Sequence, residues 1–205
     1  IKEYIEKLAF VKHIMRRQDM SKKWTGLCAV ATLLTMTTGI FAGDNIFKGG
    51  DFQEENPKKP GTPAHWGINP EKGSSWETEG DNKFLRLTSL ESGKMYMVYR
   101  QFFIKPADYG KKMKMTFKMR CNGIEKGQKS WFSGTLFIQF KNEAGKKVKG
   151  VSKIPRMAGT HAEWEEKVLE FEVPAGAHKF EVMPVLFNVK AGTMDFDDFT
   201  LEYVD

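Results

Sequence analysis

The chain has 205 residues, of which 40% are hydrophobic and 28% are charged, and its formal net charge is +6. This composition is typical of a globular protein, and the length favours one domain over two. Residues 1–42 hold seven of the 32 basic and three of the 26 acidic residues, so 25 bases and 23 acids follow, a charge near +2. So small an excess gives no reason to expect a nucleic-acid partner.

Residues 20–42 have the pattern of a secretory signal peptide. Met20 is followed by Lys22 and Lys23, and an uncharged stretch then ends in the small pair Ala42–Gly43. These are the basic, apolar and cleavage regions of such a peptide. The apolar stretch is about long enough to span a bilayer, but its Thr and Gly content favours a cleaved leader over a retained anchor. This interpretation predicts a secreted, periplasmic or cell-envelope protein without stable membrane insertion.

Residues 1–19 precede this complete leader. They are either an amphipathic helix or an upstream extension from a misplaced start, and we favour the extension because signal peptides begin at the start methionine. A lipoprotein is not expected, because Leu27 precedes Cys28 where a small residue would be needed. Cys121 is then the single cysteine of the mature chain, so no internal disulfide is possible. We expect one monomeric domain over residues 43–205.

Strands and turns are predicted from residue 45 onward, with no convincing helix. Residues 54–73 contain four of the eight prolines and predict an irregular connection. Residues 81–106 predict two strands that are broken near Ser92–Gly93. Residues 110–123 give the clearest strand, in which Met and Phe alternate with Lys, Thr and Arg, so one face is apolar and the other solvated.

The remaining strands follow the same pattern. Residues 133–148 place Leu136, Ile138 and Phe140 on one strand face and end in a turn. Residues 166–189 predict two more strands around a Pro-Ala-Gly turn. Regular strands separated by turn signals, without the helices that a parallel sheet needs, predict an all-β sandwich.

The C-terminal segment GTMDFDDFTLEYVD, residues 192–205, changes phase within one strand. Met194 and Phe196 share one face of an ideal strand, whereas Phe199, Leu201 and Tyr203 share the other. One sheet face can bury both sets only if the phase slips between them. We therefore predict a β-bulge at Asp197–Asp198, which would also redirect a carboxylate.

The usual catalytic signatures are missing from the mature chain. It has no HExxH, GxSxG, phosphate-binding glycine loop or CxxC motif. The histidines His65, His161 and His178 are far apart in sequence. A pair of carboxylates for glycoside hydrolysis is defined by geometry in space, so sequence alone does not decide it.

Four tryptophans are the most informative residues of the mature chain. Aromatic faces stack on the flat faces of sugar rings while nearby polar groups bind the hydroxyls. Trp66 and Trp164 are expected to be structural, because each leads into a strand. Trp76 and Trp131 lie in polar surroundings where burial would be awkward, so each is a candidate for stacking on a sugar.

Two predicted strands offer further candidates. Tyr96 and Tyr99 point to opposite faces of their strand, so one of them at most faces a cleft together with Gln101. Phe137 and Gln139 lie on the face opposite the apolar side chains of their strand. That face is either the floor of a binding cleft or merely solvated.

Four segments in this order resemble carbohydrate-binding modules of the family-four and family-nine type. They are NIFKGGDFQEE, Trp66 after the Pro-rich connection, WEEKVLEFEVPAG and the terminal MDFDDFTLE. The resemblance implies a galactose-binding-domain-like jelly-roll β-sandwich of two antiparallel sheets. It also implies a secreted, non-catalytic module, usually attached to glycoside hydrolases, that binds soluble or amorphous polysaccharide chains.

The resemblance further implies a structural calcium ion that ties the first strand to the last. Its ligands would be Asp51, Asp197 and backbone carbonyl groups. Calcium takes six to eight oxygen ligands, so a carboxylate redirected by the bulge suits it. Gln53 stands where the pattern often has Glu, which removes one charged ligand. The alternative is that Asp197 or Asp198 simply accepts backbone hydrogen bonds.

The sequence thus predicts a secreted module that binds a polysaccharide or oligosaccharide by aromatic stacking and hydrogen bonding in a cleft. The alternative is a structural or protein-interaction sandwich of the cell envelope without sugar binding. A small jelly-roll enzyme that degrades glycans is the third and least favoured. The candidate sugar-binding residues are Trp76, Tyr99, Gln101, Trp131, Phe137 and Gln139.

Overall fold

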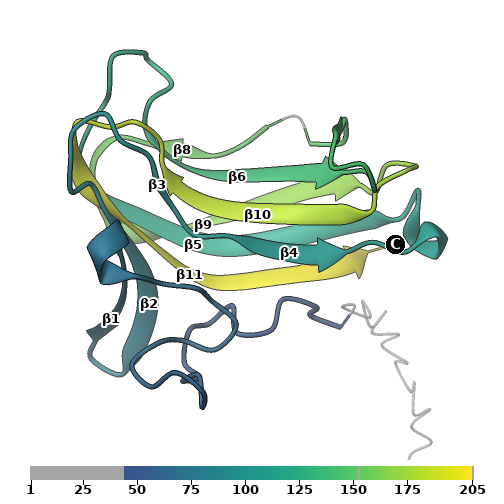
Figure 1. Ribbon diagram of the computed structural model, residues 1–205, viewed down its shortest axis with the longest axis horizontal. Coiled ribbons are helices and arrows are strands. Elements are labelled where there is room, and N and C mark those ends of the chain that lie inside the picture. The colour runs from purple at the N-terminus through teal and green to yellow at the C-terminus, as the bar shows by residue number, and fades with distance from the viewer. Residues whose placement is uncertain (1–43, 152, 205) are drawn as a thin grey trace, which may run out of the picture. The chain divides into compact units, whose positions relative to one another are not determined.

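The computed structural model in Figure 1 describes residues 44–151 and 153–204, all within one unit. The predicted signal peptide, 20–42, and the extension before it, 1–19, lie outside the described residues. Within the described residues no helix is long and apolar enough to cross a membrane.

The described residues form eleven strands and two short 3₁₀ helices. In chain order they are η1 (Pro70–Lys72), β1 (Ser74–Glu79), β2 (Asn82–Thr88), β3 (Tyr96–Met97), β4 (Arg100–Phe103), η2 (Pro106–Asp108), β5 (Lys112–Glu125), β6 (Gly134–Lys141), β7 (Lys147–Val148), β8 (Arg156–Met157), β9 (Gly159–Glu172), β10 (Lys179–Leu186) and β11 (Ala191–Val204).

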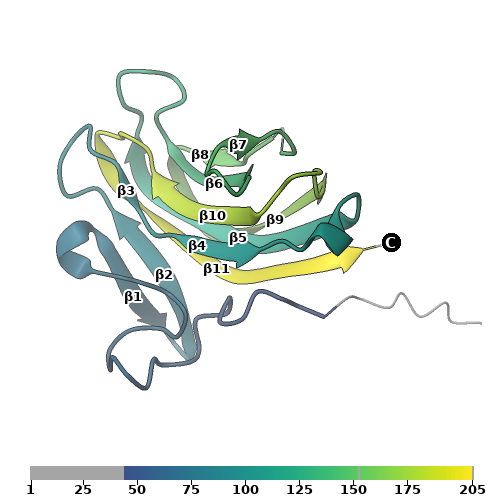
Figure 2. The same cartoon turned by 45° about the vertical axis from the view of Figure 1, so that its right-hand side comes forward.

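These strands build two antiparallel sheets. The first sheet has the order β1-β2-β11-β5-β9, and the second has β3-β10-β6-β7, with β4 also paired to β10 and β8 to β6. Figures 1 and 2 show the two sheets as layers of one sandwich. The predicted jelly-roll β-sandwich of two antiparallel sheets is confirmed, and apolar faces buried between the sheets supply its main stabilisation.

Strict alternation explains the strands that the sequence predicted best. In β5 every second side chain from Met113 to Met119 is fully buried, and its neighbours stay partly exposed. In β6 Leu136, Ile138 and Phe140 face the core as predicted. Two aromatic residues of β10 and β9, Phe180 and Phe171, pack beside Phe140 with ring centroids 4.9 and 5.8 Å away.

The structure also contains a strand that the sequence pattern did not predict. β1, with the sequence SSWETE, lacks apolar alternation, and it forms an edge strand by pairing with β2 over its whole length. β9 begins at Gly159, earlier than its apolar pattern predicts, because its polar first half extends the pairing with β5. Residues 54–73 form the predicted irregular connection, in which η1 is the only regular element.

The predicted bulge in β11 is confirmed. The register against β5 shifts after Asp197, where Asp198 and Phe199 together face one β5 residue, and Asp198 has a positive φ of 50°. Because of this extra residue, the apolar side chains on both sides of the bulge point into the core. All four of them are buried: Met194, Phe196, Phe199 and Leu201.

The bulge is also where β11 changes its neighbour. Before it, β11 pairs with β2; after it, the amide of Phe199 donates to the carbonyl oxygen of Gly50 at 3.0 Å. The amide of Leu201 donates to the Asn45 side chain at 3.0 Å. Trp66 covers this contact, with its ring 5.6 Å from that of Phe199 and its Nε1 donating to the Gly49 carbonyl oxygen at 2.8 Å. Trp66 is therefore structural, as predicted.

Gly50 provides a test of this close approach. A Cβ at Gly50 would lie 2.0 Å from the Phe199 carbonyl oxygen, whereas one at Gly67 would have no atom within 4 Å. We expect Gly50→Ala to lower the free energy of unfolding by about 1–3 kcal/mol, as overfilled sites do. The same change at Gly67 should be neutral or stabilise by about 0.4–1 kcal/mol. Urea denaturation of both variants measures this, and equal midpoints would contradict the close approach of the two segments.

Candidate functional site

The outer face of the second sheet brings most of the predicted sugar-binding residues together. β3 and β4 share one register against β10, in which Met97 lies opposite Val185 and Gln101 opposite Glu181. β6 pairs with the other edge of β10, which puts Gln139 opposite Glu181 as well. Directly opposite residues share a face, so the face is a grid of three rows. These rows are Met97, Tyr99, Gln101 and Phe103; Val185, Met183, Glu181 and Lys179; and Thr135, Phe137, Gln139 and Lys141.

Glu181 is the centre of this grid. Its side chain lies on the outer face, yet the residue is only 3% exposed, and its side-chain partners come from β6 and from the segment between β3 and β4. Its Oε1 is 2.7 Å from the Tyr99 hydroxyl group, and its Oε2 accepts from Gln139 Nε2 at 2.8 Å and from Lys141 Nζ at 3.0 Å. Buried polar groups are costly unless they are paired, and this carboxylate is paired on both oxygens.

The pKa values in this cluster follow from its geometry. Burial alone would raise the pKa of Glu181, but the hydrogen bonds from Tyr99, Gln139 and Lys141 outweigh it and lower the pKa below its ordinary value. Burial, together with the bond to Glu181, raises the pKa of Tyr99 to about 12. At neutral pH the carboxyl group is therefore ionised and the phenol keeps its proton, which it donates to Glu181.

A hollow of about 460 Å³ lies on this face beside the polar cluster. Phe137 and Met183 form its floor, and the chain after β7 forms one wall. Its lining residues are Met95, Met97, Phe137, Ile138, Gln139, Lys147, Val151, Ile154 and Met183. An apolar hollow with a few fixed polar groups at its side is the usual form of a small-ligand site.

Trp131 stands in the loop between β5 and β6, at the far end of the same face. Its carbonyl oxygen accepts from Arg156 at 2.7 Å, and Arg156 lies 6.0 Å from the centre of the Phe137 ring. The indole is 49% exposed and has Lys129 over it at 5.1 Å. Five predicted residues therefore belong to one face or its rim: Tyr99, Gln101, Trp131, Phe137 and Gln139.

Trp76 is the exception, and its place corrects the expectation that polar surroundings leave it free to meet a sugar. It lies on β1 of the first sheet, where its half-buried ring packs against the core and its Nε1 donates to the Phe52 carbonyl oxygen at 2.9 Å. Lys83 Nζ sits 4.0 Å from the ring centre and covers the indole further. The polar letters around Trp76 belong to an edge strand, so they hid a structural tryptophan.

Glu181 is the central residue of the face, and the sequence pattern did not identify it. The segment KFEVMPVL shows one acidic residue in a mostly apolar strand, which is equally typical of a solvated position. Only the register, which joins β4, β6 and β10 around it, reveals that four side chains from distant segments converge. A lone acidic residue inside an otherwise buried strand is the one signal that could have indicated it.

The predicted calcium ligands lie on either side of a pair of side-chain amides. Gln53 Nε2 donates to the Asp51 carbonyl oxygen at 2.7 Å, to Asn82 Oδ1 at 2.9 Å and to the Lys83 carbonyl oxygen at 3.0 Å. Asn82 Nδ2 in turn donates to Asp197 Oδ2 at 2.7 Å. The amide nitrogen of Gln53 thus occupies the centre of three oxygens that would otherwise be free to bind a cation.

The side-chain amides of this junction reach one carboxylate, that of Asp197, which is 2% exposed. The Asp51 carboxylate accepts from the Gln53 backbone amide at 3.4 Å. Burial, more than the hydrogen bonds from Asn82 and the Asp198 amide can offset, raises the pKa of Asp197 to about 6. Among the described residues no group of three His, Cys, Asp or Glu side chains could hold a metal ion. As it stands, this largely neutral and already hydrogen-bonded set of donors does not fit calcium, which prefers several carboxylates. Calcium at Asp51 and Asp197 stays a prediction of the resemblance.

Gln53 is the residue that decides whether this junction can bind calcium. We expect Gln53→Glu to exchange the donating amide for a carboxylate and so create a calcium site. Calcium at about 100 times its Kd should then stabilise the fold by about 2.7 kcal/mol, which for a domain of this size raises Tm by about 5–10 °C. Thermal scans with calcium and with chelator measure it for the variant, the wild type and Gln53→Ala.

The wild type and Gln53→Ala should both respond less than the Glu variant, because neither supplies the added carboxylate. An equal calcium response in the wild type would mean that the amide turns its oxygen inward and that the original expectation was right. No response in any of the three proteins would remove this junction as a metal site.

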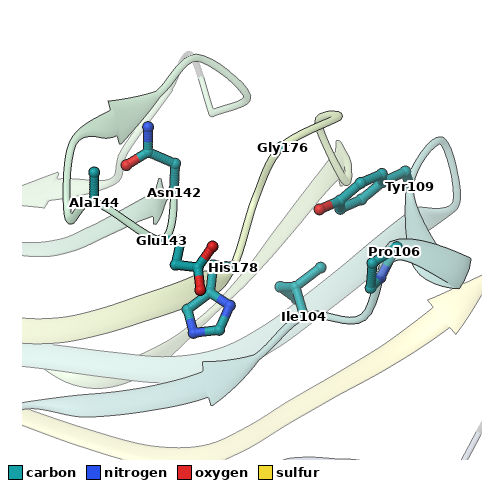
Figure 3. Close-up of a pocket in the computed structure, with 8 residues that line it drawn as sticks. All are labelled: Ile104, Pro106, Tyr109, Asn142, Glu143, Ala144, Gly176 and His178. Carbon is teal, nitrogen blue, oxygen red and sulfur yellow. The ribbon is translucent and has the colours of Figure 1, made fainter.

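A second hollow, of about 640 Å³, lies at the end of the sandwich near η2. Figure 3 shows its eight lining residues, with His178 and Glu143 on one side of the view and Tyr109 and Pro106 on the other. One of its polar groups is already hydrogen-bonded within the protein, since the Tyr109 hydroxyl donates to the Ala177 carbonyl oxygen at 3.0 Å. None of the predicted site residues lines it.

Comparisons with known proteins bear on the fold. No protein-family model matches the chain, and no curated protein sequence matches it. Among solved structures, the enzymatically active domain of tailspike protein 4 of bacteriophage CBA120 has a TM-score of 0.50 and 15% identity, and the match covers 78% of this chain and 21% of that chain. An arabinose-bound MgGH51 α-L-arabinofuranosidase has a TM-score of 0.50 and 18% identity, over 80% of this chain and 27% of that chain.

A putative sugar binding protein from Bacteroides thetaiotaomicron has a TM-score of 0.47 and 12% identity, over 78% of this chain and all 100% of that chain. Carbohydrate-binding modules of families 16, 22 and 61 are also among the matching structures. The chain spans about a fifth of the tailspike chain and about a quarter of the arabinofuranosidase chain. At these identities the likeness establishes the β-sandwich fold, and the finer assignment to families four and nine stays a prediction.

Proposed function

We propose that the chain is a non-catalytic carbohydrate-binding module that holds a polysaccharide or oligosaccharide along the outer face of its second sheet. The observation that carries this proposal is the arrangement of Tyr99, Gln101 and Gln139 around the buried carboxylate of Glu181, beside an apolar hollow. The matching sugar-binding structures support it only through the shared fold.

The chemistry of this face suits a sugar. A sugar ring offers an apolar face and a rim of hydroxyl groups, so it needs an aromatic surface next to fixed donors and acceptors. Phe137 and Tyr99 supply rings, and the amides of Gln101 and Gln139 supply hydrogen bonds. Because the Tyr99 hydroxyl donates to Glu181, its oxygen is left to accept a hydrogen bond from a sugar hydroxyl. Groups held in place before binding lose little entropy when a ligand arrives.

The proposal leaves catalysis out. Glycoside hydrolysis ordinarily needs two carboxyl groups that flank the scissile bond. Of the outward-facing residues in the grid, Glu181 alone is acidic, and three donors already engage it. Its role in this proposal is to orient Tyr99, Gln139 and Lys141.

A protein-interaction sandwich is the second candidate, and exposed apolar side chains on the same face favour it. Phe103 is 65% exposed, and Met95 and Met97 are exposed by 48% and 44%. Exposed apolar residues that gather on one face often mark a protein contact. Sugar binding accounts better for the central polar cluster, because a protein contact would not need a buried carboxylate with three fixed donors.

Substitutions on the two sheets separate these roles. We expect Trp131→Ala and Tyr99→Ala to weaken glycan binding several-fold, because a stacked ring commonly contributes about 0.5–1.5 kcal/mol beyond its buried area. Trp76→Ala is the matched tryptophan control: it should lower Tm and leave glycan affinity unchanged, because its ring belongs to the first sheet. A glycan array followed by calorimetric titration of the purified protein measures both quantities.

Unchanged affinity in both Trp131→Ala and Tyr99→Ala would move the sugar to another surface. If the folded wild-type protein binds no glycan on the array, the proposal is rejected and the protein-interaction candidate is left.

We also propose that the module is exported after removal of the leader at 20–42. The support is the basic, apolar and small-residue pattern of that segment. The intact mass of secreted protein should place the mature N-terminus within a few residues of Gly43. A secreted protein that keeps residues 1–42 would contradict the proposal.

A further inference from the structure

Three lysines form a row across the outer face of the second sheet. Lys179 of β10 lies directly opposite Lys141 of β6, and Lys141 lies directly opposite Lys147 of β7. Contacts confirm that all three face outward: Lys179 Nζ lies 5.6 Å from the centre of the Phe103 ring, Lys141 Nζ bonds Glu181, and Lys147 lines the 460 Å³ hollow.

Such a row costs stability unless something offsets it. Like charges directly opposite each other on neighbouring strands repel. Glu181 offsets one of the three charges through its 3.0 Å ion pair with Lys141. In the part of the chain that the structure describes, Lys147 and Lys179 form no ion pair, and neither does Glu143, the acidic residue of the adjoining turn.

The opposite end of the face is also cationic. Arg156 lies opposite Thr135 and reaches the carbonyl oxygen of Trp131, and Lys129 covers the indole of Trp131. From Thr135 to Lys141 the strand β6 rises by about 20 Å, at roughly 3.3–3.4 Å per residue. A chain of several sugar units laid along β6 would therefore meet positive charge at both ends.

On the first sheet, in contrast, most cations are paired with acidic side chains. Arg86 and Arg120 both bind Asp195, and Lys118 binds Asp198 at 2.8 Å. On the second sheet, the outward-facing residues of β4, β6, β7, β8 and β10 comprise four cations and the one acid Glu181. Between the two sheets, the positive excess of the strand residues thus lies on the face that carries the proposed sugar site.

We propose that the ligand of this face is an anionic polysaccharide, whose carboxylate or sulfate groups lie against Lys147 and Lys179. This inference rests on the proposed sugar-binding function and specifies its ligand class. The aromatic and amide groups in the middle of the grid hold the sugar rings. The lysine row forms ion pairs with the carboxylate or sulfate groups of those sugars. Lysine suits this task, because its flexible ammonium group acts as a point charge toward anions at several positions. Arg156 and Lys129 extend the same preference to the Trp131 end.

The test compares polysaccharides that share a backbone and differ in whether their acidic groups are charged. Polygalacturonate is paired with its methyl-esterified form, alginate with its propylene-glycol ester, and chondroitin sulfate with its desulfated, carboxyl-esterified form. We expect the purified protein to bind at least one anionic member more tightly than its neutral partner. Raising NaCl from about 0.1 M to about 1 M shortens the screening length from about 10 Å to about 3 Å, and it should weaken that binding. Carboxylate and sulfate are distinguished by desulfated chondroitin that keeps its free carboxyl groups: binding that is lost on desulfation alone depends on sulfate.

Lysine substitutions locate the effect. Lys147→Gln and Lys179→Gln should each weaken binding of the anionic member by about twofold to fivefold, the range of exposed ion pairs, and leave binding of the neutral partner unchanged. Lys112→Gln is the matched control: it removes an exposed lysine of the first sheet that forms no ion pair among the described residues, and it should change neither affinity.

Each remaining outcome has a definite meaning. Equal affinity for the charged and neutral members, with loss of binding in Tyr99→Ala, overturns the inference and keeps the sugar-binding function. An equal loss in Lys112→Gln and Lys147→Gln also overturns it, because the attraction would then be a general effect of net charge. Binding of no glycan, charged or neutral, rejects both the inference and the proposed function.

Discussion

One extra residue in β11 is the constraint on which the rest of the sandwich depends. β11 is the central strand of the first sheet, and its apolar side chains fall in two opposite phases. The bulge at Asp198 brings both sets onto one face, so that Phe196 and Phe199, three residues apart, are both buried. Without the bulge, half of the strand would turn its apolar side chains to water, and the core between the sheets would lose its middle layer.

The same bulge lets the start of the domain close onto its end. Beyond it β11 has left β2, and the segment that contains Gly50 takes the free edge with a direct hydrogen bond to Phe199. Gln53 and Asn82 then link Asp51 to Asp197 through amide hydrogen bonds. These hydrogen bonds connect the segment around Asp51 to the last strand of the domain.

Sequence patterns predicted those features that depend on period and composition alone. Strand β5 is predictable because one face is apolar and the other mostly charged, and β6 because Leu136, Ile138 and Phe140 alternate with Phe137 and polar residues. The bulge is predictable because a phase change in an apolar pattern has few other solutions. β1 was missed because an edge strand with polar side chains lacks that period. The polar centre of the site was beyond the sequence, because Glu181 acquires its meaning from Tyr99 and Gln139, which lie 82 and 42 residues away. Trp76 shows the converse error, since the residues next to it in sequence do not show what covers it in space.

The two outer faces differ in how their polar and aromatic groups are paired. On the first, Asp195 is held by two arginines, and Phe84 packs edge-on to Trp164 at 5.5 Å, so the polar and aromatic groups satisfy one another. On the second, the central carboxylate is equally well held, but the rings and charges around it face outward with little opposing charge. The fully hydrogen-bonded carboxylate at the centre keeps the surrounding side chains in place. The rings and cations around it still lack partners, so a ligand that contacts them gains binding energy. A binding surface requires side chains that are held in place and neighbouring groups that still lack partners. In this sandwich the paired carboxylate of Glu181 and the outward-facing rings and cations around it occur together on one face.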